Sequence, residues 1–340
     1  MSPKRLSQSP LAGPAFALGA FALFSVHDLI VKTLGGSYSP VQIVFFSTLL
    51  GMPLAMLVLM RDPTDGNLFP RRPGWTALRT GAAVMTGVSV FYAFSVLPLA
   101  QTYAILFATP LLITALSVPL LGERVGIHRG AAVVVGLLGV LIVLRPGQGD
   151  GLSLGHLAAL VGAAGSSLAS IIVRKIGSEE RGFVLLIYPM MANLAVMGMM
   201  LPFVYQPMPL GDLGALALMA ALALAASFGV IAAYTRAPAF QIAPMQYSQI
   251  IWAVIFGALF FGEGVDLFTI IGAAVIILSG IYIVMREDRA NVSDNRPVLA
   301  TRTRTDTGTY PRAGGIGRLD NPDDPADGPD AAPGQRPPPE

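Results

Sequence analysis

Long apolar runs alternate with short polar segments along most of the chain. A helix needs about 20 mostly apolar residues to cross roughly 30 Å of hydrocarbon. Ten runs meet that requirement, at residues 13–33, 40–60, 77–97, 100–121, 128–145, 154–174, 182–204, 212–235, 241–261 and 267–285. Because these runs are continuous rather than short and alternating, they indicate helices and not the strands of a barrel. The pattern predicts an all-α integral membrane protein with ten transmembrane helices.

The two ends of the chain differ from the spans. Residues 1–12 include Lys4 and Arg5 and predict a short cytoplasmic N-terminus. The apolar run that follows is too long for a signal-peptide core, so we expect an uncleaved first span. Residues 287–340 are rich in Pro, Gly, Asp, Arg and Thr, with few large apolar side chains. Such a segment cannot bury a core, and we expect a disordered cytoplasmic tail.

The apolar region contains an internal repeat. The matching pairs are Gly122-Glu123 with Gly262-Glu263, Pro98 with Pro238, Gln101 with Gln241, and Ile30-Val31-Lys32 with Ile172-Val173-Arg174. This alignment divides the chain into two five-helix repeats, 13–146 and 147–286. Five spans per repeat is an odd number, so the two repeats must be inverted relative to each other. Inverted repeats are a recurring architecture of secondary transporters.

Composition agrees with a membrane protein. Of the 340 residues, 54% are hydrophobic and only 12% are charged, whereas a soluble domain carries roughly 25% charged residues. We therefore expect the lipid bilayer as a partner. The net charge of +2 gives no reason to expect nucleic-acid binding. There are no cysteines, which excludes disulfides and thiolate metal sites, and we expect no cofactor.

Basic residues are distributed unequally between the two membrane faces. With the N-terminus inside, the cytoplasmic segments hold Lys4, Arg5, Arg61, Arg71, Arg72, Arg79, Arg124, Arg129, Arg174, Lys175, Arg181 and Arg236. The outer ends hold only Lys32 and Arg145. This bias follows the positive-inside rule and predicts that both termini are cytoplasmic.

Two motifs give the chain a family resemblance. The fourth span of each repeat ends in Gly-Glu, as Leu121-Gly122-Glu123 and Phe261-Gly262-Glu263, and the fifth carries a glycine-containing apolar stretch, 136–140 and 277–281. The chain resembles the EamA family of the drug/metabolite transporter superfamily. The resemblance implies a location in a bacterial inner membrane and a central cavity lined by spans 1, 3, 4, 6, 8 and 9, with spans 5 and 10 peripheral. It also implies a small-molecule substrate, and we expect a monomer or homodimer.

Asp28 is the outstanding candidate for chemistry because it lies within the first span. A carboxylate in hydrocarbon is costly and usually faces a polar cavity with a partner. Asp28 would then bind a coupling proton or cation, or the amine of a substrate, with His27 as its neighbour. The alternative is an ion pair with Lys32, one helical turn further along.

The remaining candidates for substrate or coupling contacts are uncharged polar or aromatic side chains, with one arginine. They are Tyr92, Gln101, Tyr103, Thr109, Ser170, Tyr234, Arg236, Gln241, Tyr247, Ser248 and Trp252. In a continuous α-helix, Gln241, Tyr247 or Ser248, and Trp252 share a broad face. The alternatives are hydrogen bonds that only join helices and, for Arg236, a side chain that extends to the interface. Glu123 and Glu263 are expected to anchor the start of the following helix through its dipole.

These features favour a secondary transporter with alternating access, proton-coupled or exchanging, for a small polar metabolite such as an amino acid, vitamin or nucleoside-like compound. No phosphate-binding loop motif is present, so the chain has no ATPase of its own. A passive channel is the alternative, although it calls for a continuous polar lining. An intramembrane enzyme is a further alternative. The G-x-S-x-G match at residues 151–155 is better explained by Ser153 as a helix N-cap, and we expect no enzyme.

Overall fold

The computed structural model describes residues 12–60, 68–123, 125–145, 152–177, 179–234, 236–237 and 239–289. Within these residues the regular structure is entirely helical. The elements are α1 (Ala12–Gly35), α2 (Pro40–Met60), α3 (Pro73–Val96), α4 (Leu99–Leu106), α5 (Thr109–Leu121), α6 (Ile127–Leu144), α7 (Leu154–Ile176), α8 (Gly182–Val204), α9 (Leu210–Tyr234), α10 (Ala239–Ile242), the 3₁₀ helix η1 (Ala243–Ser248), α11 (Gln249–Phe261) and α12 (Leu267–Arg289).

In this part of the chain ten helical segments are long and apolar enough to cross a membrane, which confirms the ten predicted spans. The tenth span continues as α12 to Arg289, beyond the predicted start of the tail. Residues 1–11 and the tail from residue 290 lie outside the described residues, so the structure tests neither the predicted cytoplasmic N-terminus nor the disorder predicted for the tail.

The fourth and ninth spans are interrupted at matching places. In the fourth, α4 ends at Leu106 and α5 begins at Thr109, because Pro110 has no amide hydrogen to donate to the preceding turn. In the ninth, the 3₁₀ helix η1 separates α10 from α11. The repeat alignment places Phe107 opposite Tyr247, so the two interruptions are equivalent. Their rings meet edge to face with centroids 5.1 Å apart, which brings the two halves together at these breaks.

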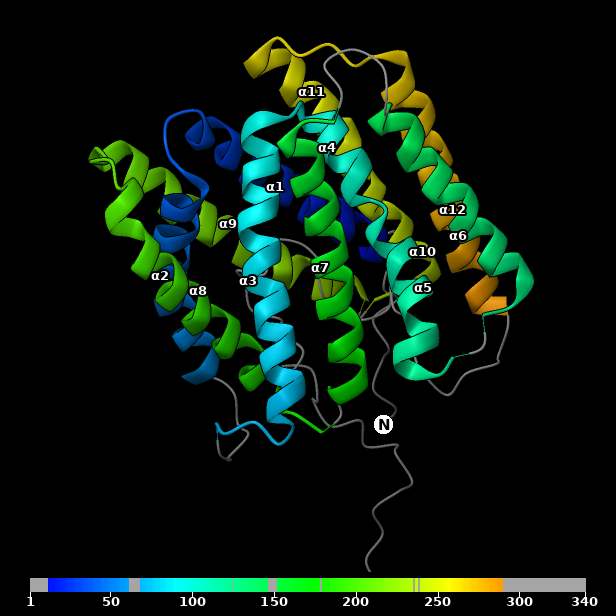
Figure 1. Cartoon of the computed structure of the whole chain (residues 1–340), viewed down its shortest axis with the longest axis horizontal. Helices are drawn as coiled ribbons and strands as arrows, with labels where there is room; N and C mark the ends of the chain where they lie inside the picture. Colours follow the sequence, from blue (N-terminus) through cyan, green and yellow to red (C-terminus); the bar gives the residue numbers. More distant parts are fainter. Residues whose placement is uncertain are drawn as a thin grey trace, which may run out of the picture.

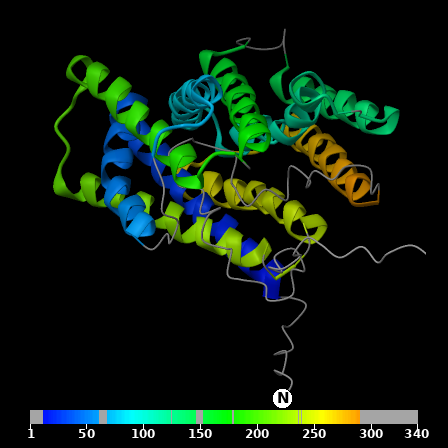
Figure 2. The same ribbon diagram turned by 90° about the horizontal axis from the view of Figure 1, so that it is seen from below.

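Helices of the two halves pack against each other reciprocally. The most extensive contacts join α1 to α9, α3 to α7 and α6 to α12. The first two pairs are equivalent, since each joins the first span of one half to the third span of the other. Figure 1 shows α3 beside α7 in the centre and α6 beside α12 along one flank. In Figure 2, viewed from below, α1 lies along α9.

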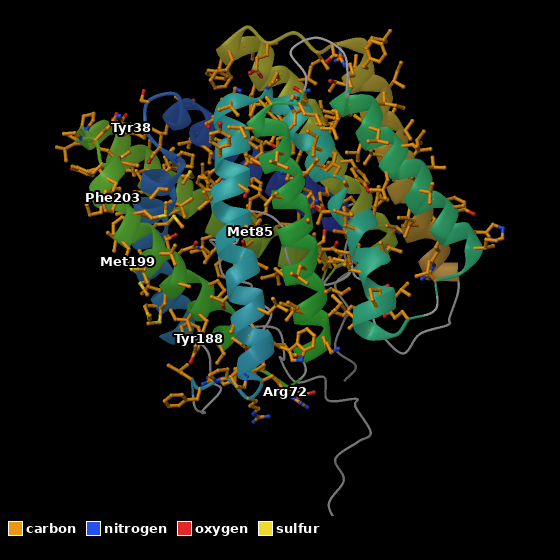
Figure 3. The ribbon with its side chains drawn as sticks, viewed as in Figure 1. Tyr38, Arg72, Met85, Tyr188, Met199 and Phe203 are labelled. Atoms are coloured by element: carbon orange, nitrogen blue, oxygen red, sulfur yellow. The ribbon has the colours of Figure 1, made fainter. Side chains whose placement is uncertain are left out.

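Large apolar side chains cover the outside of the bundle. Phe203 is 88% exposed and Leu210 86% exposed, and Figure 3 shows Met199 and Phe203 on the outer flank of α8. A soluble monomer rarely exposes such extended apolar surface. These faces are therefore suited to lipid, as expected of a multi-pass membrane protein.

Small residues allow a close helix crossing between α6 and α12. A Cβ atom on Gly272 would lie 2.6 Å from the carbonyl oxygen of Gly139, which is closer than two such atoms can approach. Without a hydrophobic driving force between helices in lipid, close backbone packing through glycine is a main source of association. The α6–α12 pair depends on this crossing.

We predict that Gly272→Val destabilises the protein by about 1–3 kcal/mol, because the added side chain must push α12 away from α6. Gly81→Val is the matched control, since a Cβ at Gly81 on α3 meets no atom within 4 Å. Thermal unfolding of the purified protein in detergent measures both effects. Equal melting temperatures for the two variants would contradict the tight crossing.

Candidate functional site

The carboxylate of Asp28 lies inside the bundle, on α1, and is 0% exposed to solvent. Its Oδ1 atom is 2.7 Å from Nδ1 of His27. Its Oδ2 atom accepts a hydrogen bond from the hydroxyl of Tyr103 on α4. Burying an ionised carboxylate is costly unless partners replace its hydration. The two contacts supply such partners from two different spans.

The hydrogen-bond chain continues from Tyr103 into the other half. The side-chain amide of Gln249, at the start of α11, donates to the Tyr103 hydroxyl at 3.3 Å. The Tyr103 ring is held by Phe94 and Phe107, with centroid distances of 5.3 and 5.9 Å. The chain Asp28–Tyr103–Gln249 therefore joins α1, α4 and α11, and crosses between the two halves.

A small, mostly enclosed cavity lies beside this chain of hydrogen bonds. Its volume is about 20 Å³, which is room for about one water molecule. The lining residues are Val90, Tyr103, Leu106, Phe107, Thr109, Ser166, Gln246 and Gln249. Ser166 Oγ is buried and has no hydrogen-bond partner among the described residues. A mostly enclosed space with a mixed polar and apolar lining and an unpartnered hydroxyl group is suited to a guest that carries a polar group.

The spans that surround this cavity are largely those implied by the family resemblance. Spans 3, 4, 6 and 9 contribute lining side chains, and span 1 contributes Asp28 through its bond to Tyr103. The eighth span, α9, supplies none of the lining residues. Spans 5 and 10, which are α6 and α12, lie together at one flank (Figure 1).

Several predicted site residues gather around the cavity. Thr109 lines it, and the Tyr247 ring packs on Phe107. The hydroxyl groups of Tyr247 and Ser248 are buried and have no hydrogen-bond partner in the described part of the chain. Ser170 is also buried, one turn from Ser166, and donates to its carbonyl oxygen at 2.8 Å. Together with Asp28, His27 and Tyr103, these residues form the candidate site.

Other predicted residues lie away from the cavity. Gln101 contacts Nε2 of His156 at 2.9 Å, at the starts of α4 and α7. Arg236 is exposed. Its guanidinium group donates to the Ala232 carbonyl at 2.7 Å and lies 4.5 Å from the Phe16 ring centre. Tyr234 packs, half-buried, on the α1–α9 cluster. Tyr92 is half-buried on α3.

The face expected along the ninth span is not formed. Gln241 is exposed, and Trp252 packs against Phe256 with ring centroids 5.7 Å apart. The cause is the 3₁₀ helix η1, which has about three residues per turn and shifts the helical phase. As a result, Gln246 and Gln249 face the cavity, and neither was singled out as a site residue. Pro244 near the start of the span was the available signal.

Lys32, the alternative partner for Asp28, forms its ion pair elsewhere. Its Nζ atom lies 2.7 Å from Oε1 of Glu263, which belongs to the other half. The same Nζ donates to the Leu97 carbonyl at 2.6 Å. Glu263 was expected to anchor the start of α12. Instead, its Oε2 accepts from the Leu99 amide at the start of α4, at 3.0 Å.

With this geometry established, comparison with known proteins identifies the family. The sequence matches the EamA-like transporter family twice, over residues 11–145 and 153–286. The chain belongs to the EamA-like transporter family. It is therefore a multi-pass membrane transporter with a small-molecule substrate. A solved structure superposes with a TM-score of 0.54 at 17% identity, covering 84% of this chain and 100% of its own, so it shares the fold.

Several named transporters are similar to this chain over nearly their full length. A pseudopaline exporter of Pseudomonas aeruginosa is 25% identical over 270 residues, which cover 79% of this chain and 94% of the exporter. A riboflavin transporter of Vibrio cholerae is 26% identical over 296 residues, covering 84% and 96% of the two chains. An S-adenosylmethionine uptake transporter of Rickettsia felis is 24% identical, covering 82% and 95%.

We predict that Tyr103→Phe destabilises this transporter by about 1.5–3 kcal/mol, because it removes a hydrogen bond to a buried charged group. Tyr247→Phe is the matched control. It deletes a buried hydroxyl that has no partner among the described residues, and it should leave stability unchanged or slightly raised. Thermal unfolding in detergent compares the two. A larger loss in Tyr247→Phe would contradict the assigned bonding.

Proposed function

We propose that the chain is a secondary carrier that alternates access to the cavity beside Asp28. Its substrate is a small polar metabolite such as an amino acid, vitamin or nucleoside-like compound, moved with a proton or in exchange. The observation that carries the proposal is the Asp28 carboxylate, which is fully buried and joined to Tyr103 next to a mostly enclosed cavity with a mixed polar and apolar lining. The relatives named for riboflavin and S-adenosylmethionine support cargo of this kind.

The contacts of Asp28 suit a group that exchanges partners during transport. Tyr103 and His27 contact its two oxygens. A protonated amine of the substrate, or a proton, could take over the role of these contacts and neutralise the carboxylate. Either event changes the charge of the site, which lets binding alter the relative stability of conformations open to opposite faces.

The shape of the cavity favours a carrier over a passive channel. A channel needs a continuous pathway that ions or molecules can follow. Here the cavity beside Asp28 has a volume of only about 20 Å³ and is mainly enclosed. A metabolite could enter only after the helices around it separate at one end, as in alternating access between two related halves.

In the proposed orientation the protein lies in the inner membrane, and both of its termini are in the cytoplasm. Figure 3 shows Arg72 and Tyr38 at opposite ends of the bundle. Arg72 lies at the end that also carries Glu179, its partner at 2.7 Å, and Lys175, 4.4 Å from the Trp75 ring centre. The excess of basic residues near that end supports a cytoplasmic assignment.

We predict that Asp28→Asn lowers transport efficiency roughly tenfold to a hundredfold, since a lost charge-assisted contact is worth about 1.5–3 kcal/mol. Thermal-stability screening of the purified protein against a metabolite library that includes riboflavin and S-adenosylmethionine first selects a ligand. Counterflow of that radiolabelled ligand in proteoliposomes then measures transport, across pH. A carrier shows stimulation by ligand on the opposite side, and a channel does not.

Asp212→Asn serves as the control, because Asp212 lies near one end of the bundle and hydrogen-bonds Tyr38 at 2.5 Å. Size-exclusion profiles establish that both variants remain folded. Flux by Asp28→Asn equal to that of the parent at every pH would remove Asp28 from the site.

Cysteine labelling tests the orientation without background, because the chain has no cysteine. Gly36→Cys lies between α1 and α2, and Leu68→Cys lies before α3. We predict that a membrane-impermeant maleimide labels Gly36→Cys in intact spheroplasts and labels Leu68→Cys only after permeabilisation. The reverse pattern would invert the proposed topology.

A further inference from the structure

Two largely buried ion pairs tie the two halves of the bundle together. One joins Lys32 of α1 to Glu263, which follows α11, at 2.7 Å. The other joins Arg174 of α7 to Glu123, which follows α5, at 2.5 Å. We refer to these as the Lys32 junction and the Arg174 junction. In both, the basic side chain is 8% exposed and the glutamate 19% exposed.

The two junctions are equivalent under the internal repeat. The alignment matches Lys32 with Arg174 and Glu263 with Glu123. Each junction therefore joins the first span of one half to the end of the fourth span of the other half. Because the halves are inverted, the junctions fall near opposite ends of the bundle. Neither was evident from the sequence, which shows four separate charged residues at span ends.

A glycine positions each glutamate. Gly122 has φ 71° and Gly262 has φ 64°, and among the described glycines these two have positive φ. This left-handed conformation ends the helix and is favourable mainly for glycine. The amide of the next residue then turns back to the helix, with Glu123 bonded to the Ser117 carbonyl at 3.3 Å and Glu263 to the Gly257 carbonyl at 2.9 Å. The Gly-Glu motif thus presents the carboxylate to the opposite half.

The Lys32 junction contacts several helices at its end of the bundle. Lys32 also bonds the Leu97 carbonyl, and Glu263 bonds the Leu99 amide. These groups belong to the connection between α3 and α4, so one ion pair gathers α1, α3, α4 and α11. Its ammonium group also lies 5.1 Å from the Phe261 ring centre. At the opposite end, Lys175 next to Arg174 donates to the Leu120 carbonyl of α5 at 2.7 Å.

An ion pair is well suited to a closure that must open repeatedly. Inside the protein, the attraction between the charges offsets the loss of their hydration, and the two terms nearly balance. When an end opens, water replaces the lost partner, so separation is inexpensive. An apolar seal would instead expose apolar surface to water on each opening.

We propose that the Lys32 junction and the Arg174 junction are the two gates of the carrier, one at each membrane face. This inference rests on the alternating access proposed above. Each ion pair bridges the two halves at one end only. When the halves rock apart at one end, the junction at that end separates and the other junction stays formed. With both pairs formed, the cavity lined by Tyr103 and Ser166 is mostly enclosed and has a volume of about 20 Å³.

The test uses Ser166→Cys, a reporter that lines the cavity in a chain without native cysteine. Its labelling by a small membrane-impermeant methanethiosulfonate is measured in spheroplasts and in inverted vesicles, without substrate. We expect Lys32→Glu or Glu263→Lys to raise labelling from the face of the Lys32 junction about fivefold or more, with no increase from the other face. Arg174→Glu or Glu123→Arg should do the reverse.

Charge-exchanged double variants, Lys32→Glu with Glu263→Lys and Arg174→Glu with Glu123→Arg, should restore labelling toward that of the parent. Exposed ion pairs provide matched controls at each end. Arg145–Asp266 joins the halves at the flank, with side chains 30% and 44% exposed, and Arg72–Glu179 has side chains 57% and 45% exposed. Arg145→Glu and Arg72→Glu should leave the labelling of Ser166→Cys unchanged.

The membrane face from which labelling increases distinguishes a gate from an ion pair that only stabilises the fold. Increased labelling from both faces in every variant, or unchanged labelling in all of them, overturns the proposal. If a charge reversal fails to yield monodisperse protein, the milder Lys32→Gln and Arg174→Gln variants are read by the same criterion. If the parent protein shows counterflow but the variants do not change labelling from one face only, the gates alone are rejected. If the variants change labelling from one face only but the parent shows no counterflow, the carrier mechanism is rejected.

Discussion

The unfavourable free energy of placing charge inside a membrane bundle organises this structure. An ionised group that leaves water must find an opposite charge or hydrogen bonds. Here each charged group has a partner in another span: Lys32 meets Glu263, Arg174 meets Glu123, and Asp28, besides its neighbour His27, meets Tyr103. The first two contacts cross between the halves, and the third extends across through Gln249. The requirement that stabilises the buried charges therefore also fixes how the halves lie against each other.

The spans were predictable because apolar length is a local property of the sequence. The second and seventh spans begin and end at the expected residues, 40–60 and 182–204. Asp28 could be singled out for the same reason, since a carboxylate within an apolar run has an obvious cost. Its neighbours His27 and Tyr103 were also among the expected residues, although their bonds to it depend on the packing of α1 and α4.

Features that depend on helical phase or on distant partners were not predictable. The 3₁₀ segment in the ninth span turns Gln249 inward and leaves Gln241 exposed. Glu263 bonds the start of α4, while Asp266 takes the expected role at α12 by accepting from the Phe268 and Thr269 amides at 3.0 and 3.1 Å. Residues far apart in the chain decide such pairings, and periodicity carries no information on them.

The helices of the two halves match, but the buried carboxylate of Asp28 has no acidic counterpart at the equivalent position of the second half. The alignment that matches Lys32 with Arg174 matches Asp28 with Ser170, whose hydroxyl remains uncharged and bonds its own helix. A single carboxylate thus balances one unit of positive charge. A monocation, or one proton, gives an electrically neutral assembly at this position. In the carrier proposed above, a dication would retain net charge in a low-dielectric interior, so this asymmetry would limit the valence of a species that binds at Asp28 alone.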